Sequence, residues 1–352
     1  MKRHILYFFM FACIPLLQAQ ETEPPAADSL ISDDQQAEIL YNESIAFYED
    51  GYLDSAMRRL NIVLMKKPDF YKALYNRGQI SYLLGDYPGS LKDYNAVLDI
   101  KKTDKAYFGR GLARFQLGDL KGAIEDFTAC LETNPNFPQA YYYRGGAKFK
   151  TGDYQDAKDD YTRAISINND YAYACNDRGS ANWKLGLLEE AQEDFFRATI
   201  LNPTLAQAFN NLGGVKKELG EYEEAVTDYT AAVKVDPEYY IAYNNRGTTY
   251  FILEEYDKAI ADYTKTLELK PEYIPAYNNR GNARYELEDY HGAVADYDEV
   301  IKLDPDNASA YLNRGISKEM LREDKEACSD WQTAFELGIE EAGEYLKTCK
   351  KD

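Results

Sequence analysis

The sequence is poor in the residues that most catalytic and metal sites require. Its 352 residues include two histidines and five cysteines. One of those histidines, His4, lies in a short apolar segment at the start of the chain that we expect to be removed. A Ser-His-Asp triad or a histidine-rich zinc site needs more histidine than the remaining His291 supplies. No glycine-rich phosphate loop is present either. We therefore expect no enzymatic activity, no metal and no cofactor.

Positive charge is scarce as well. The chain carries 40 Lys and Arg against 60 Asp and Glu, a formal net charge of −20. A general nucleic-acid-binding protein needs a basic surface to neutralise phosphates, so we expect no nucleic acid among the partners. The simplest interpretation of the acidity is that it keeps the protein soluble.

The first nineteen residues are typical of a secretory signal peptide. Lys2 and Arg3 precede an apolar run over residues 5–17, which is too short to cross a bilayer as a helix. Ala19 offers a small residue for cleavage. We expect an exported protein, periplasmic or secreted. A lipid anchor on Cys13 is the alternative, and the only membrane attachment we expect. Residues 20–38 are polar, acidic at first and Pro-containing, which predicts a disordered linker.

A sequence motif of about 34 residues recurs through the rest of the chain. A Gly falls five residues after the start of eight of nine copies, and a small residue follows twelve positions later in all of them. Such a period predicts a repeat array. We assign the repeats to residues 39–72, 73–105, 106–139, 140–173, 174–207, 208–241, 242–275, 276–309 and 310–343, followed by a capping helix and tail over 344–352.

Each repeat has the pattern of two helices joined by a turn. In residues 276–309, apolar side chains recur at helical spacing on both sides of Glu288-Asp289, where other repeats carry Gly. A Pro near the end of six repeats stops the second helix. One such pair cannot bury its own apolar face, so neighbouring pairs must stack.

This pattern of Gly, small residues and Pro in a 34-residue helical repeat resembles the tetratricopeptide repeat (TPR) family. The resemblance implies an all-α fold, a right-handed α-solenoid in which the first helix of each repeat lines a concave groove. It also implies a non-catalytic scaffold that binds extended segments of a protein or peptide partner in that groove. A structural subunit of a cell-envelope complex is the alternative.

An Arg precedes the first Gly in seven repeats, where the family usually carries Leu, and an Asp follows it sixteen residues later. In an antiparallel hairpin these two positions face each other, which predicts an ion pair within each repeat. The first repeat carries Glu43 and Arg59 at the same places, so both signs are exchanged together. The sixth departs from the rule, with Leu212 opposite Asp228. Binding of a ligand by these Arg side chains is the less favoured alternative.

The family resemblance also places candidate groove residues on the first helices. Repeats two to five carry Lys and aromatic side chains there, which suits a partner with apolar and acidic side chains or a terminal carboxylate. Repeats six to nine carry Asn, whose amide can both donate to and accept from a main chain. The candidates are Lys72, Tyr75, Tyr82, Lys105, Phe108, Phe115, Tyr142, Phe149, Lys150, Trp183, Lys184, Asn211, Asn245, Asn279 and Asn313. Packing and hydrogen bonding between repeats would also explain these residues.

The cysteines outside the signal peptide fall into two groups. Cys130 and Cys175 replace core residues of separate repeats, so we expect buried free thiols. Cys328 lies on the last repeat and Cys349 on the capping segment that should pack against it. In an oxidising compartment these two should form a disulfide.

Overall fold

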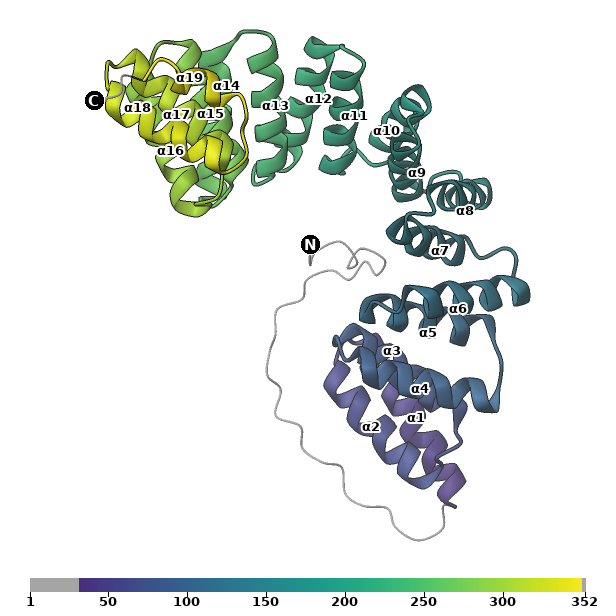
Figure 1. Cartoon of the computed structure of the whole chain (residues 1–352). Helices are drawn as coiled ribbons and strands as arrows, with labels where there is room; N and C mark the ends of the chain where they lie inside the picture. The colour runs from purple at the N-terminus through teal and green to yellow at the C-terminus, as the bar shows by residue number, and fades with distance from the viewer. Residues whose placement is uncertain (1–31, 350–352) are drawn as a thin grey trace. The chain divides into compact units, whose positions relative to one another are not determined.

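The computed structural model describes residues 32–349, which form helices and no strand (Figure 1). The helices are α1 (Asp33–Glu49), α2 (Leu53–Lys66), α3 (Tyr71–Leu83), α4 (Tyr87–Ile100), α5 (Asp104–Leu117), α6 (Leu120–Thr133), α7 (Pro138–Thr151), α8 (Tyr154–Ile167), α9 (Ala172–Lys184), α10 (Leu188–Leu201), α11 (Ala206–Glu218), α12 (Tyr222–Val235), α13 (Tyr240–Ile252), α14 (Tyr256–Leu269), α15 (Ile274–Glu286), α16 (Tyr290–Leu303), α17 (Ala308–Met320), α18 (Asp324–Glu336) and α19 (Ala342–Leu346). The predicted all-α helical-repeat fold is confirmed.

The helices form two compact units, one ending at Ala73 and the other beginning at Leu74. In the first unit, α2 packs on α1, and Ala56 and Leu60 of α2 are fully buried. Lys66 and Lys67 near the end of α2 form ion pairs of 3.0 and 2.9 Å with Asp33 and Asp34 at the start of α1. In the second unit, hairpins from α5–α6 to α17–α18 stack one on the next.

The two ends of the described chain differ from the sequence expectation. Helix α1 begins at Asp33, so the predicted linker over residues 20–38 extends too far. Ser32 accepts a hydrogen bond from the backbone N–H of Gln35, whose side chain accepts one from the backbone of Ser32. This capping box starts the helix. Residues 20–31 and the predicted signal peptide lie outside the described residues.

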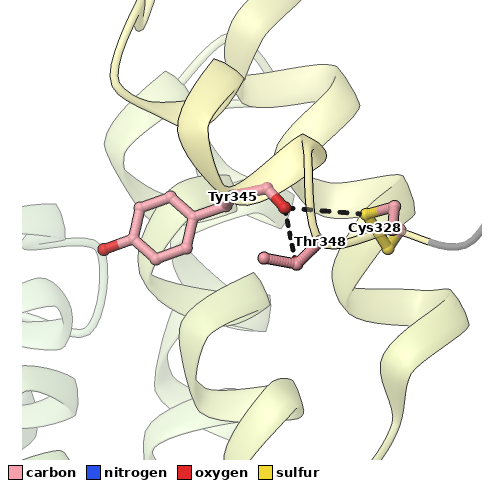
Figure 2. Close-up of a disulfide and its surroundings, with 4 residues drawn as sticks. Cys328, Tyr345 and Thr348 are labelled. Atoms are coloured by element: carbon pink, nitrogen blue, oxygen red, sulfur yellow. Dashed lines mark hydrogen bonds between the residues drawn. A yellow bond between two sulfur atoms is a disulfide. The ribbon is translucent and has the colours of Figure 1, made fainter.

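The capping segment is also shorter than the sequence suggests. Its helix, α19, contains five residues, Ala342–Leu346, and begins before residue 344. The chain then turns, with the Thr348 hydroxyl donating to the carbonyl of Tyr345 over 2.6 Å, and a disulfide joins Cys349 to Cys328 (Figure 2). Cys130 and Cys175 are buried free thiols, as predicted.

A Gly on the first helix packs against an aromatic ring on the second helix of the same hairpin. The ring is deeply buried in each case, and a Cβ added to the Gly would lie within 3.4 Å of it. The pairs are Gly78–Tyr94, Gly111–Phe127, Gly145–Tyr161, Gly179–Phe195, Gly213–Tyr229, Gly247–Tyr263, Gly281–Tyr297 and Gly315–Trp331. These contacts let the two helices approach closely around one large side chain.

Adjacent glycines on α7 provide a test of this packing. A Cβ at Gly145 would lie 3.0 Å from Tyr161 and 3.2 Å from the backbone oxygen of Ala157, whereas at Gly146 the nearest atom is 3.8 Å away. We expect Gly145→Ala to lower the free energy of unfolding by about 1–3 kcal/mol through overpacking. Gly146→Ala should raise it by up to about 1 kcal/mol, because Ala favours helix. Urea unfolding of both variants checks this, and equal stabilisation would contradict the packing argument.

Candidate protein-interaction surface

The predicted Arg–Asp pairs are present within the hairpins. In each, the Arg Nη2 lies 2.5–2.7 Å from the Asp Oδ1, and the Asp side chain is at most 7% exposed. The pairs are Arg77–Asp93, Arg110–Asp126, Arg144–Asp160, Arg178–Asp194, Arg246–Asp262, Arg280–Asp296 and Arg314–Asp330. In the first compact unit, Arg59 reaches Glu43 at 3.1 Å. The register prediction is confirmed.

A second cation, which the sequence reasoning overlooked, contacts several of these carboxylates. It comes four residues after the Arg position, one helical turn further on the same face. Its distance to the Asp is 2.7–2.9 Å for Arg114, Lys148, Lys216, Arg284 and Lys318. Lys216 explains the exceptional hairpin α11–α12, because it pairs with Asp228 where Leu212 replaces the Arg. The spacing of four was visible in the sequence and could have revealed this cation.

The same Arg residues also reach back to the preceding hairpin. Arg144 donates through Nη1 to the Thr128 hydroxyl at 3.1 Å, and Arg280 donates to Thr264 at the same distance. Arg314 instead contacts the carboxylate of Asp298, at 2.6 Å. Each partner lies sixteen residues before its Arg. Each guanidinium group therefore connects the second helices of two neighbouring hairpins and sets the register between hairpins as well as within them. Few of its N–H donors remain for a ligand.

The first helices of the second compact unit contact one another in sequence, from α5 and α7 through to α15 and α17. Side chains 35 residues apart meet along this row. The rings of Phe108 and Tyr143 have centroids 5.8 Å apart. Further along, Tyr142 donates to Asp177 over 2.8 Å. Several candidate groove residues thus pack between repeats.

The Asn candidates continue the same series of contacts. Asn211 donates to Asn176 over 3.1 Å, and Asn245 donates to Asn210 over 3.0 Å. Asn313 makes a different bond, to Asn282 at 3.3 Å. Asn279 is half-buried, and its side chain makes no hydrogen bond with another side chain of the described residues. Hydrogen bonding between repeats, one of the two interpretations open from the sequence, therefore holds for Asn211, Asn245 and Asn313.

A second line of contacts joins the later turns of the first helices. Gln116 donates to the Tyr82 hydroxyl over 3.3 Å, and the Lys150 ammonium lies 5.4 Å from the centre of the Phe115 ring. Trp183 donates through Nε1 to Glu218. These aromatic rings are half-buried, like Tyr75 and Phe149, which pack on Tyr94 at 5.6 Å and Tyr154 at 5.1 Å.

The lysine candidates differ from the aromatic ones because they face solvent. Lys105, Lys150 and Lys184 are exposed and make no ion pair with any residue in the described range. Lys72 is exposed too but belongs to the first compact unit, whereas the other candidates belong to the second. The second unit therefore presents three unpaired ammonium groups on first helices that also carry half-buried aromatic rings.

Neither metal ligation nor a membrane span is found between residues 32 and 349. No group of three or more His, Cys, Asp or Glu residues there is placed to hold a metal ion. No helix in that range is both long and apolar enough to cross a bilayer.

Family comparisons identify the repeat. A model described as a tetratricopeptide repeat matches residues 105–137, 138–171 and 240–273, and another with the same description matches residues 41–106. A third, described as a TPR repeat, matches residues 215–253 and 281–321. The chain contains tetratricopeptide repeats.

Solved TPR structures share this fold. The C-terminal part of a TPR repeat-containing protein from Cytophaga hutchinsonii is 20% identical, with a TM-score of 0.57 over 68% of this chain and 100% of that one. PilF from Pseudomonas aeruginosa is 21% identical, with a TM-score of 0.53 over 60% of this chain and 96% of the other. A crystal structure of MamA is 27% identical and covers 46% of this chain and 94% of its own, with a TM-score of 0.44. No curated protein matches the sequence.

Proposed function

We propose that the protein is a non-catalytic scaffold that binds extended protein segments along the first helices of its second compact unit. The observation that carries this proposal is the set of exposed, unpaired ammonium groups of Lys105, Lys150 and Lys184. The TPR fold supports it, because successive first helices lie against one another and can present one continuous surface.

The chemistry of this surface favours partner segments with acidic and apolar side chains, or a terminal carboxylate. A carboxylate would form charge-assisted hydrogen bonds with the ammonium groups. Half-buried rings such as Phe115 and Phe149 offer apolar contacts between them. Asn211 and Asn245 contribute less than the sequence suggested, because their amides already bond between repeats.

We further propose that the protein is exported. The signal-peptide pattern of residues 1–19 motivates this, and the disulfide between Cys328 and Cys349 supports it, because structural disulfides persist mainly in oxidising compartments.

The second candidate function is a structural subunit of an envelope complex, with or without a lipid anchor on Cys13. It is favoured by an apolar pair on α10, where Phe196 is 57% exposed and Ile200 is 61% exposed. The two residues are four positions apart and share one helix face. Adjacent exposed apolar side chains on one helix face offer a surface on which another protein chain can pack.

Charge reversal on the first helices tests the scaffold. We expect the triple variant Lys105→Glu, Lys150→Glu and Lys184→Glu to capture at least about tenfold less partner from envelope extract, since opposed charges cost several kcal/mol across an interface. Its melting temperature should stay close to that of wild type, because these lysines are exposed and unpaired.

A matched control makes the same charge change on second helices, at the exposed Lys92, Lys121 and Lys234. It should capture partner as wild type does. If both triple variants capture equally well, the scaffold proposal is wrong. Loss of capture in Phe196→Ser alone would favour the envelope-subunit candidate.

A further inference from the structure

A cavity of about 260 Å³ lies between hairpins α15–α16 and α17–α18 of the second compact unit. A water molecule takes up about 30 Å³ in the liquid, so the cavity has room for a side chain of several heavy atoms. It is lined by Asn282, Tyr285 and Glu286 from α15, Tyr297 from α16, and Asn313 and Ile316 from α17.

Hydrogen bonds hold this lining in place. The Oδ1 atom of Asn282 accepts from the Tyr297 hydroxyl at 2.7 Å and from the Asn313 amide at 3.3 Å. The ring of Tyr285 packs edge-on against Tyr290, with centroids 5.3 Å apart. The polar and aromatic groups around the cavity are thus positioned before any ligand arrives.

The charge of the cavity is negative. Glu286 is the single charged residue of its lining and makes no ion pair in the part of the chain that the structure describes. Burial raises the pKa of Tyr285, and the nearby groups of Tyr290, Glu286, Tyr345 and Glu319 raise it further. The carboxylate of Glu319 on α17 therefore acts on Tyr285 as a second negative charge. No Lys or Arg lines the cavity to balance these acids.

The same places on the first helices carry the opposite charge in earlier hairpins. Tyr285 and Glu286 lie four repeats of 34 residues after Phe149 and Lys150. Near the end of α7, an aromatic residue is followed by the exposed cation Lys150. At the end of α15, an aromatic residue is followed by the exposed anion Glu286. At this position the charge changes from positive on α7 to negative on α15.

An unused hydrogen-bond acceptor lies one turn from the cavity. Asn176 and Asn210 each accept from an Asn 35 residues later. Asn278 occupies the equivalent place on α15, but Asn313 bonds to Asn282 instead, and the buried Oδ1 of Asn278 has no partner. The cavity therefore lies beside the place where this series of Asn–Asn hydrogen bonds is interrupted.

We propose that the cavity binds a basic side chain, the ammonium of Lys or the guanidinium of Arg. Both groups are donors only, which matches the carboxylate of Glu286, the one charged group of the lining. The half-buried ring of Tyr285 adds apolar surface and cation–π attraction. That the side chain belongs to a bound protein segment rests on the scaffold function proposed above. A segment with acidic residues over Lys150 and a basic residue in this cavity would bind in one direction.

Titration of the intact protein with N-acetyl-arginine amide tests the site directly. The Ile316 methyl group lines the cavity, so its NMR signal should shift in a saturable manner. The neutral isostere N-acetyl-citrulline amide should bind at least about tenfold more weakly, because it lacks the charge. Glu286→Gln should weaken arginine binding by a similar factor.

Two controls separate this inference from the scaffold proposal. Glu272→Gln removes an exposed carboxylate outside the cavity and should bind arginine amide as wild type does. The triple Lys→Glu variant should also retain arginine binding, whatever its effect on partner capture. Equal shifts with the citrulline probe, or undiminished arginine binding by Glu286→Gln, would overturn the assignment of this cavity to a cation.

Discussion

Asp296→Asn is expected to lower the free energy of unfolding by about 3–5 kcal/mol, the cost of removing one partner from a buried ion pair. The Asp296 side chain is 3% exposed and accepts from two guanidinium groups, those of Arg280 at 2.6 Å and Arg284 at 2.7 Å. An amide of the same shape leaves Arg280 without an anion at the seam between α15 and α16, and leaves Arg284 with only its longer contact to Asp289, at 3.7 Å. Urea unfolding followed by circular dichroism measures the loss.

Asp228→Asn is the matched control within the same chain. Asp228 has one cationic partner, Lys216, since Leu212 replaces the Arg. Burial, together with the nearby Glu224, raises the pKa of Asp228 even though Lys216 acts to lower it, so the folded state favours the charged form less than the unfolded chain does. Neutralising it should therefore cost less than neutralising Asp296. If the two variants lose the same free energy, the doubled cation does not stabilise the hairpin.

The ion pairs show what a repeated sequence makes predictable. A spacing of sixteen, together with the exchange of signs at Glu43 and Arg59, was enough to place both partners across one hairpin. Within a hairpin the register follows from the turn position alone. The additional bond from Arg144 to Thr128 depends on the angle between neighbouring hairpins, which helical periodicity does not encode.

The candidate interaction surface was harder to derive for the same reason. A side chain on the first helix can point toward the next repeat or toward solvent. Neighbouring positions within one helical turn point in these two different directions. Tyr142 and Asn211 therefore matched a ligand-binding pattern while making contacts between repeats. Exposed lysines such as Lys184 were less ambiguous, because an unpaired ammonium rarely lies in a contact between repeats.

Chain ends were predictable where a local signal was present. Ser32 and Gln35 form a capping box, whose spacing could have placed the start of α1 from the sequence. The early end of α19 has no comparable local signal. Cys349 has to return to Cys328, so a tertiary bond and not helix propensity decides where the last residues turn.

Cys349→Ser is expected to destabilise the last hairpin and its cap by about 3 kcal/mol, from the loss of a covalent loop in the chain-entropy model. The disulfide joins residues 21 positions apart, with Cα atoms separated by 5.9 Å (Figure 2). The segment that it fastens covers an apolar cluster in which Tyr345 packs on Trp331, with ring centroids 5.1 Å apart. Without the bond, only the non-covalent contacts of the five-residue helix α19 and its flanking turn hold the cap in place.

Hydrogen exchange resolves this effect better than global unfolding, because a repeat array can open at one end while the rest stays folded. Amides of α18 and α19 should exchange about 100-fold faster in Cys349→Ser, while those of α7 to α10 should keep the wild-type rate. Adding reductant to the oxidised wild type should reproduce the change, and the same addition should leave Cys349→Ser unaffected. Cys130→Ser, which removes a buried free thiol on α6, should retain the response to reductant because its disulfide is intact. If thiol labelling of the unfolded, unreduced protein finds Cys328 and Cys349 both free, the cap is not covalently fastened and its contacts with Trp331 alone hold it in place.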